Sequence, residues 1–251
     1  MSDHGLAVEI RGLGLAYSKR AALVDIELDL APGERVCLVG PNGAGKSSLL
    51  RCLTRLVEPS SGSIRLDGMP LGSIERAALA RSISVVPGQV ELPFSMSVEE
   101  VVRLGRIPHE HPLSGPGEAD QRAADEAMER VGIDHLRGRD VRELSLGERQ
   151  LVLVAMAVAQ DGRLIVLDEP TVHLDLRHQV EVLSLLARLS ADGVTVVAVL
   201  HDLPLAAHFF PRLVLLDQGR IVADGPPSAV LTPERIRDVY GVDPRFVPVL
   251  A

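Results

Sequence analysis

The chain has 251 residues, of which 46% are hydrophobic and 2% aromatic, and its formal net charge is −8. A chain of this length and hydrophobicity can bury a substantial core, so the composition excludes an intrinsically disordered protein. The acidic balance argues against nucleic acid or an anionic membrane surface as the main partner, and the few aromatic residues argue against a base-stacking platform.

Neither disulfides nor membrane spans are expected. The two cysteines, Cys37 and Cys52, are too few for a disulfide framework or a metal cluster, and we expect plain buried thiols in a reducing compartment. The N-terminal segment has no basic stretch followed by an apolar core, so we expect no signal peptide. The longest apolar run, residues 151–159, is about half a membrane span, which predicts a soluble protein.

The first 30 residues alternate between apolar and polar side chains, which predicts antiparallel strands. After a turn at residues 32–34, the apolar run Arg35–Val39 predicts a buried strand, and a helix is expected over 46–57. The remaining pattern predicts, in chain order, a hairpin strand over 63–68, a strand over 83–86, helices over 98–104, 118–131 and 146–159, a strand over 164–167, a helix over 176–189, and strands over 194–200, 213–216 and 220–223.

Strands that alternate with helices predict an α/β fold with a mostly parallel sheet. The N-terminal strands are expected to form a separate antiparallel β subdomain. Residues of about 89–160 are rich in proline at first and helical later, which predicts a helical subdomain inserted into a core of about 1–88 and 161–251. We expect the whole chain, 1–251, to be one domain.

Residues 40–47 read Gly-Pro-Asn-Gly-Ala-Gly-Lys-Ser and fit the phosphate-binding pattern G-x-x-x-x-G-K-[ST] between a predicted strand and a predicted helix. Glycines let the backbone curl so that its N–H groups point inward toward phosphate, and the helix adds its positive N-terminal end. A chance glycine-rich turn is the alternative, but a composition product gives it roughly 0.1%. The pattern predicts a P-loop NTPase (RecA-like) core.

The P-loop residues have distinct expected roles. Lys46 supplies a mobile positive charge to the β- and γ-phosphates of a bound triphosphate, and the hydroxyl of Ser47 can bind Mg²⁺. The residues expected to contact nucleotide here are Gly40, Pro41, Asn42, Gly43, Ala44, Gly45, Lys46, Ser47 and Ser48.

A second element is the apolar strand 164–167, which ends in Asp168 and Glu169. Unpaired carboxylates are costly at the end of a core strand, so two of them in sequence need an explanation. Asp168 is suited to hold Mg²⁺, and Glu169 can polarise a water molecule for attack on the γ-phosphate. The alternative is a strand that simply ends in acidic loop residues.

Further motifs follow in a fixed order: Leu-Ser-Leu-Gly-Glu at 144–148, Asp-Glu-Pro-Thr at 168–171 with Asp175 shortly after, and His201 behind an apolar strand. Together with the P-loop, this ordered set resembles the nucleotide-binding subunit of an ABC transporter. The resemblance covers the chain from Tyr17 to about Val242.

The resemblance implies a head-to-tail dimer of two copies, with two ATP molecules between them and the P-loop of one copy facing residues 144–148 of the other. It implies that Tyr17 stacks on adenine, that Asp175 lies at the dimer interface and that His201 contacts the γ-phosphate. A packed tyrosine at a strand end is the alternative for Tyr17. The residues implied to reach nucleotide from the partner side are Ser145, Gly147, Glu148 and Asp175. His109 and His111, in a Pro-rich loop, are not assigned to a metal site.

The chain departs from the family at three positions. Leu146 stands where the family has glycine; it costs about 1–2 kcal/mol if the backbone needs a positive φ and only adds bulk if φ is ordinary. Leu151 stands where a basic residue is usual. By spacing, the glutamine that the family carries for catalysis and Mg²⁺ falls on Gly88, and either Gln89 takes this role or the role is empty. We favour Gln89, because a turn at Pro87–Gly88 can absorb a slip of one residue.

Residues 97–109 fit [ST]-V-x-E-x-V-x-x-G-R-x-P-[HY], and with the tail over 225–241 they resemble the ATPases of importers for iron–siderophore, haem and cobalamin. An amphipathic helix in a generic subdomain is the alternative. The resemblance implies integral membrane permease subunits as partners, a solute-binding protein as an indirect partner, and a peripheral location on the cytoplasmic face of the inner membrane. The competing functions are an importer ATPase for another solute, such as a metal ion or an oxyanion, and a soluble ABC ATPase outside transport.

Overall fold

The computed structural model describes residues 5–18, 20–88, 95–110, 115, 117–172, 174–243, 245 and 247. Its strands are β1 (Val8–Tyr17), β2 (Arg20–Leu30), β3 (Arg35–Val39), β4 (Ser61–Leu66), β5 (Met69–Pro70), β6 (Ile83–Val86), β7 (Leu164–Asp168), β8 (Thr195–Val199), β9 (Arg212–Asp217) and β10 (Arg220–Gly225). Its α-helices are α1 (Lys46–Leu53), α2 (Arg76–Ser82), α3 (Val98–Leu104), α4 (Glu118–Val131), α5 (Leu146–Ala159), α6 (Leu176–Ala191), α7 (Leu203–Phe209), α8 (Pro227–Val230) and α9 (Pro233–Tyr240). Short 3₁₀ helices cover Leu71–Ser73, Ile107–His109, Asp134–Leu136 and Val141–Glu143.

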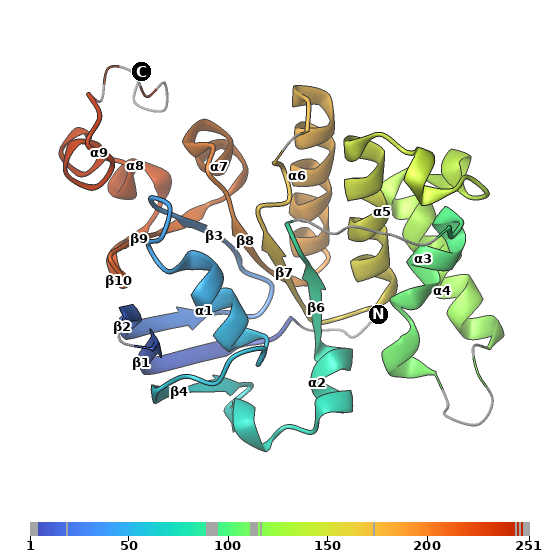
Figure 1. Ribbon diagram of the computed structural model, residues 1–251, viewed down its shortest axis with the longest axis horizontal. Coiled ribbons are helices and arrows are strands. Elements are labelled where there is room, and N and C mark those ends of the chain that lie inside the picture. Colours follow the sequence, from blue (N-terminus) through green and yellow to red (C-terminus); the bar gives the residue numbers. More distant parts are fainter. Residues whose placement is uncertain are drawn as a thin grey trace.

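Two sheets organise these elements (Figure 1). The larger sheet has the strand order β10-β9-β3-β8-β7-β6, and its pairings are parallel except for the antiparallel pair of β9 and β10. The smaller sheet, β2-β1-β4-β5, is antiparallel and lies below α1 in Figure 1. The predicted α/β fold with a mostly parallel sheet is therefore confirmed.

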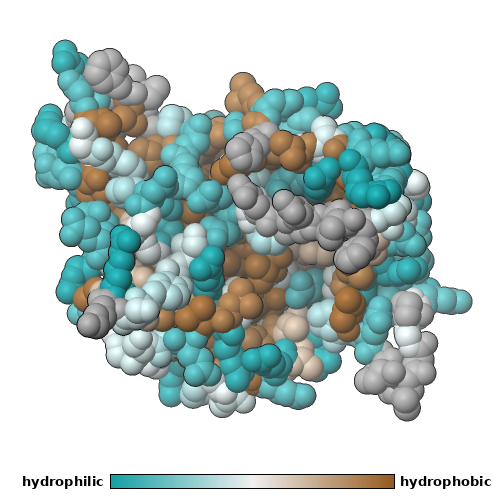
Figure 2. Space-filling view, in the orientation of Figure 1, coloured by the Kyte–Doolittle hydropathy of each residue, from teal (hydrophilic) through white to brown (hydrophobic). Residues whose placement is uncertain are grey.

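The surface in this view is largely hydrophilic, with apolar side chains gathered near its middle (Figure 2).

Beside α1 and β6, a cavity of about 380 Å³ has Leu50, Leu56 and Val85 among its apolar lining residues. The Leu56 side chain is 71% exposed. Over the described ranges, no helix is both long and apolar enough to cross a membrane.

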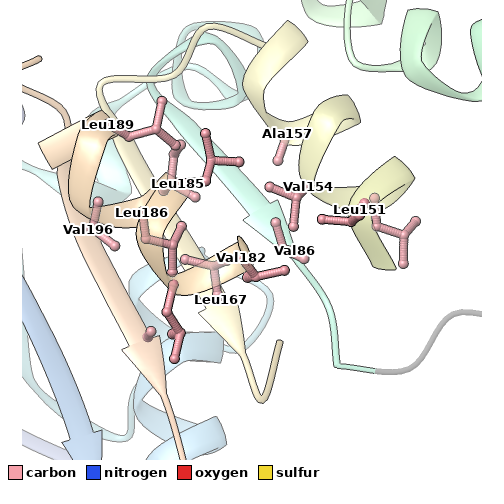
Figure 3. Packing of buried hydrophobic residues seen from close by; sticks show 14 of the residues in the cluster. Val86, Leu151, Val154, Ala157, Leu167, Val182, Leu185, Leu186, Leu189 and Val196 are labelled. Carbon is pink, nitrogen blue, oxygen red and sulfur yellow. The ribbon is translucent and has the colours of Figure 1, made fainter. Parts of the chain in front are cut away.

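The larger sheet is buried on both faces, which explains why its strands read as continuous apolar runs rather than as alternating ones. Successive side chains of β3 enter two different clusters: Val36 and Leu38 pack toward the antiparallel sheet and α1, whereas Cys37 and Val39 pack toward the helices of the other face. Figure 3 shows the second cluster, in which α5 and α6 lie against the sheet. Both Cys37 and Cys52 are buried free thiols, as predicted.

Helices α3, α4 and α5 pack together at one side of the molecule, on the right in Figure 1. The segment that follows α3 ties this group to the core. Arg106 donates to the carbonyl of Ala159 at 2.7 Å, and His109 Nε2 lies 2.8 Å from the carbonyl of Gln160, so both satisfy the C-terminal end of α5. The Gln160 amide in turn donates to the carbonyls of Ala80 and Ile83. The Gly-Arg-x-Pro-His part of residues 97–109 thus has a structural role.

Most predicted elements agree with the structure within a few residues, but the helix expected over 46–57 ends at Leu53. Arg55 adopts a left-handed conformation with φ 56°. Its N–H donates to the carbonyl of Cys52, and the N–H of Leu56 donates to that of Arg51, which is the Schellman arrangement that ends helices. Glycine usually occupies this position at the end of a helix. Because arginine occupies it here, the sequence does not show where α1 ends.

Helices α2, α7, α8 and α9 were not predicted at all. Each is short, between 4 and 8 residues, so the apolar periodicity has little length in which to show. A local signal for α7 existed, because Asp202 accepts from the N–H of Leu205 as an N-cap and Pro204 follows in the first turn.

Gly105 offers a stability test of the contact between α3 and α5. A Cβ at this position would lie 2.1 Å from the carbonyl oxygen of Met156, a backbone atom that cannot rotate away. We expect Gly105→Ala to lower the free energy of unfolding by about 2 kcal/mol, measured by urea denaturation. Gly138→Ala is the matched control, because nothing lies within 4 Å of its Cβ; its change should stay within about 0.5 kcal/mol. Equal stability of the two variants would contradict the contact.

Candidate functional site

The P-loop joins β3 to α1 and is held open by glycine. Gly40, Gly43 and Gly45 have φ values of 143°, 79° and 109°, a region that other residues rarely adopt. Gly40 also packs so closely that a Cβ would lie 2.1 Å from the carbonyl oxygen of Leu216. Gly45 is the N-cap of α1 and offers no side-chain cap, so the first amides of that helix remain available to an anion.

A pocket of about 380 Å³ lies against this loop. Its lining residues come from the end of β1, the start of β2, the P-loop, the start of α1 and the loop after β7: Tyr17, Arg20, Ala21, Ala22, Asn42, Gly43, Gly45, Lys46, Ser47, Ser48 and Glu169. Tyr17 is 42% exposed, which leaves its ring available for stacking. The cations of Arg20 and Lys46 and the N-terminus of α1 make this pocket suited to a polyanion with an aromatic group.

Lys46 is buried at the base of the pocket, with 5% of its surface exposed. Its ammonium donates to the carbonyl oxygens of Gly40 at 2.7 Å and Pro41 at 2.9 Å. Burial lowers the pKa of Lys46 from its usual value, against the opposing attraction of Glu169 and Asp168. An anion in the pocket would favour the charged form of this side chain.

Ser47 and Asp168 come together from α1 and β7. The hydroxyl of Ser47 donates to a carboxylate oxygen of Asp168 at 3.0 Å. Burial raises the pKa of Asp168, the Ser47 hydrogen bond lowers it, and the neighbouring charge of Glu169 raises it again, with a net rise. Two hard oxygen ligands at this distance form a donor set that fits Mg²⁺.

Glu169 lies one residue beyond β7 in a strained conformation, with φ 56°. A left-handed backbone costs a residue with a side chain about 1–2 kcal/mol. The Glu169 N–H donates to the carbonyl of Val199 at 3.2 Å, which holds this turn against the end of β8. The Glu169 carboxylate lies 2.6 Å from Nε2 of His201, which follows the same strand. Strain of this kind concentrates at functional sites because the surrounding structure must hold it.

Gly88 follows β6 and touches the back of this turn. A Cβ on Gly88 would lie 2.4 Å from the carbonyl oxygen of Asp168, so no larger side chain fits. This close approach explains the departure from the family at the position where spacing places a glutamine. Gln89, predicted for that role, lies outside the described residues.

The residues predicted to reach a partner's nucleotide lie at the starts of α5 and α6. Ser145 and Glu148 form a capping box: the Ser145 hydroxyl accepts from the N–H of Glu148, and the Glu148 carboxylate accepts from the N–H of Ser145. Asp175 caps α6 by accepting from the N–H of His178. None of Ser145, Gly147, Glu148 and Asp175 is among the described residues that line the P-loop pocket.

The structure resolves two of the departures noted in the sequence. Leu146 is the first residue of α5, is 59% exposed and is absent from the described residues with a positive φ, so it adds bulk without backbone strain. Leu151 is 7% exposed and packs into the cluster of Figure 3, which is an apolar site. Two further residues were not predicted: Arg20 lines the pocket, and its nearness to Tyr17 was its only signal, whereas His178 contacts Asp175 and Gly147 and has no signal in the sequence.

The family model described as ABC transporter matches residues 23–172, which is more than half of the chain. This chain belongs to the ABC transporter family. The ABC ATPase is 37% identical to the achromobactin transport ATP-binding protein of Dickeya dadantii, over 96% of this chain and 90% of that protein. It is 39% identical to the hemin import ATP-binding protein of Bordetella avium, over 97% of this chain and 95% of that protein.

Solved structures agree with this assignment. An ABC transporter described as of metal-chelate type, in an inward-facing conformation, superposes with a TM-score of 0.84 at 31% identity and covers 95% of this chain and 90% of its own. A dimeric ATP-binding cassette in a post-hydrolysis state with ADP and Pi superposes with a TM-score of 0.76 at 26% identity and covers 88% of this chain and 98% of its own. The ABC ATPase therefore binds nucleotide and hydrolyses ATP, as the sequence predicted.

Asp168 tests how much stability the folded chain loses by burying a charged carboxylate at the site. Its pKa is raised on folding, so at neutral pH the folded ABC ATPase holds a carboxylate that burial disfavours. Asn keeps the oxygen that accepts from Ser47, so we expect Asp168→Asn to raise the free energy of unfolding at pH 7, without nucleotide, by on the order of 1 kcal/mol. The gain should disappear as the pH falls through the pKa of folded Asp168, because wild type is then neutral too.

Urea denaturation at several pH values measures this difference. Asp161→Asn is the matched control, because Asp161 is exposed and asparagine tolerates its positive φ. A variant at Asp168 that is less stable than wild type at pH 7 would contradict the account.

Proposed function

We propose that this ABC ATPase is the ATP-hydrolysing subunit of an importer for iron–siderophore, haem or cobalamin, and that it works on the cytoplasmic face of the inner membrane as a peripheral protein. The observation that carries the site assignment is that the P-loop and Glu169 line one pocket, while Asp168 is hydrogen-bonded to Ser47 and His201 to Glu169. The solute class is supported by relatives named for achromobactin and hemin. Importers of other metal ions or oxyanions remain the alternative.

The roles proposed for the pocket follow from its chemistry. Tyr17 stacks on adenine, the P-loop amides and Lys46 neutralise the phosphates, and Glu169 accepts a proton from the attacking water. His201, 2.6 Å from Glu169, holds that carboxylate in place and reaches toward the γ-phosphate. Ser47 and Asp168 would hold Mg²⁺, with Gln89 as a further ligand; the ion would balance charge on the phosphates.

The site is completed, in this proposal, by a second copy of the chain. Ser145, Gly147, Glu148 and Asp175 are not among the described residues that line the pocket, and a dimeric relative structure supports a partner that supplies them. Two ATP molecules then lie between the copies, and hydrolysis reopens the dimer.

The second partner is a membrane permease. We propose that the helical subdomain of about 89–160, inserted between core parts of about 1–88 and 161–251, receives it together with the cavity beside α1. Apolar residues are exposed at the cavity and at the end of α3: Leu56 lines the cavity and is 71% exposed, and Leu104 and Ile107 are 39% and 58% exposed. A solute-binding protein acts through the permease and never touches this chain.

Lys46 tests the nucleotide site. We expect Lys46→Ala to weaken ATP binding at least tenfold, because the buried ammonium is the cation at the base of the pocket. Isothermal titration calorimetry measures the affinity. Arg188→Ala, which removes an exposed cation from α6, is the control and should bind like wild type. Near-normal ATP affinity of Lys46→Ala would contradict the assignment.

Reconstitution with the cognate permease in vesicles tests the transport function. We expect hydrolysis of Mg-ATP to rise when a binding protein loaded with an iron–siderophore, haem or cobalamin is added, and Glu169→Gln to reduce hydrolysis at least a hundredfold while ATP binding remains. Stimulation by a binding protein loaded with a free metal ion or an oxyanion would favour the alternative importer. Hydrolysis by wild type no faster than by Glu169→Gln would reject the proposal.

A further inference from the structure

His178, in the first turn of α6, contacts both segments that the proposed dimer interface needs. Its Nδ1 lies 2.7 Å from Oδ1 of Asp175, and its backbone N–H donates to the same oxygen at 2.9 Å. Because an ionised carboxylate can only accept, Nδ1 carries the hydrogen of this bond. The helix cap of Asp175 is already made by the backbone N–H, so the ring adds a second contact that capping does not require.

The face of the same ring lies against Gly147 at the start of α5. A Cβ on Gly147 would lie 2.9 Å from Cγ and 3.0 Å from Nδ1 of His178, closer than side-chain atoms pack. Gly147 is absent from the described residues with a positive φ, so glycine is required here by space and not by backbone conformation. The first turn of α5 therefore rests on a flat imidazole.

The segment that ends at Asp175 begins at the proposed catalytic base. The N–H of Val172 donates to the carbonyl of Glu169, and the Gln179 amide of α6 donates to the carbonyl of Thr171, both at 3.3 Å. The residues just after Glu169 are thus held by their own turn and by Gln179, and Asp175 is held by the backbone N–H and ring of His178. A shift of α5 against His178 would be passed to this loop.

We propose that His178 is a positioning residue that couples the two ATP sites of the dimer, by fixing Gly147, which serves the partner's nucleotide, relative to the loop of Glu169, which serves its own. This inference rests on the proposed function, because it needs the dimer. His178 does not line the pocket, so it acts on the arrangement of the sites and not on nucleotide binding within one chain.

Steady-state hydrolysis by the reconstituted transporter separates coupling from binding. We expect His178→Ala to lower kcat about tenfold with KM for ATP within about twofold of wild type. His178→Asn keeps an N–H donor close to the position of Nδ1 and should restore kcat to within about threefold of wild type. His135→Ala, which removes an exposed histidine from a short 3₁₀ helix outside the pocket, is the control and should match wild type.

A double-mutant cycle tests the contact itself. Gly147→Ala alone should lower the free energy of unfolding of the single chain, because its methyl group collides with the ring. In the presence of His178→Ala that collision is gone, so the double variant should be about as stable as His178→Ala alone in urea denaturation without nucleotide. Losses of stability that simply add would show that Gly147 and His178 do not touch and would overturn the proposal.

The remaining outcomes are equally decisive. A wild-type kcat for His178→Ala, an Asn variant as slow as the Ala variant, or a loss confined to KM would each overturn the coupling role. A fall in the thermal unfolding midpoint of His178→Ala without a fall in kcat would show a merely structural role. Failure of the proposed function is distinguishable, because wild type would then hydrolyse ATP no faster than Glu169→Gln.

Discussion

Four parallel strands end side by side, and the proposed site is built on residues at or just beyond those ends. β3 leads into the P-loop, β7 ends in Asp168 and leads into Glu169, β8 leads into His201 and β6 into Gly88. The order β3-β8-β7-β6 makes these ends neighbours although they are far apart in sequence. Open α/β sheets bind their ligands at such carboxyl ends, because the helices cover both faces and leave this edge free.

The same edge of the sheet holds buried charges and a strained backbone, which lower the stability of the fold. The pKa of Asp168 is raised and that of Lys46 lowered by burial, and Glu169 holds a left-handed backbone. Each costs free energy without a ligand, and a bound polyanion with its cation would offset the two electrostatic costs. The two packed faces of the sheet supply the stability that permits this arrangement.

Much of the fold and the chemical groups of the site could be predicted from short segments, since each motif carries its own spacing and its own flanking strand or helix. The prediction failed where a conformation lacked its usual residue, as at Arg55, which ends α1 in place of glycine. It was incomplete where the residue type at one position depends on the space left by a residue distant in sequence. Gly88 is small because of Asp168, and Gly147 because of His178, and no local pattern records either contact.

By itself, the sequence determined the chemistry: a P-loop with its lysine, a strand that ends in two carboxylates, and a histidine behind a further strand, in the order of an ABC ATPase. Only the tertiary structure decided which of these groups touch. It paired Glu169 with His201, gave Leu146 an ordinary helical start, and placed the ring of His178 between α5 and the loop of Glu169. The physical reason is that motifs are local, whereas packing of separate segments sets the distances between them.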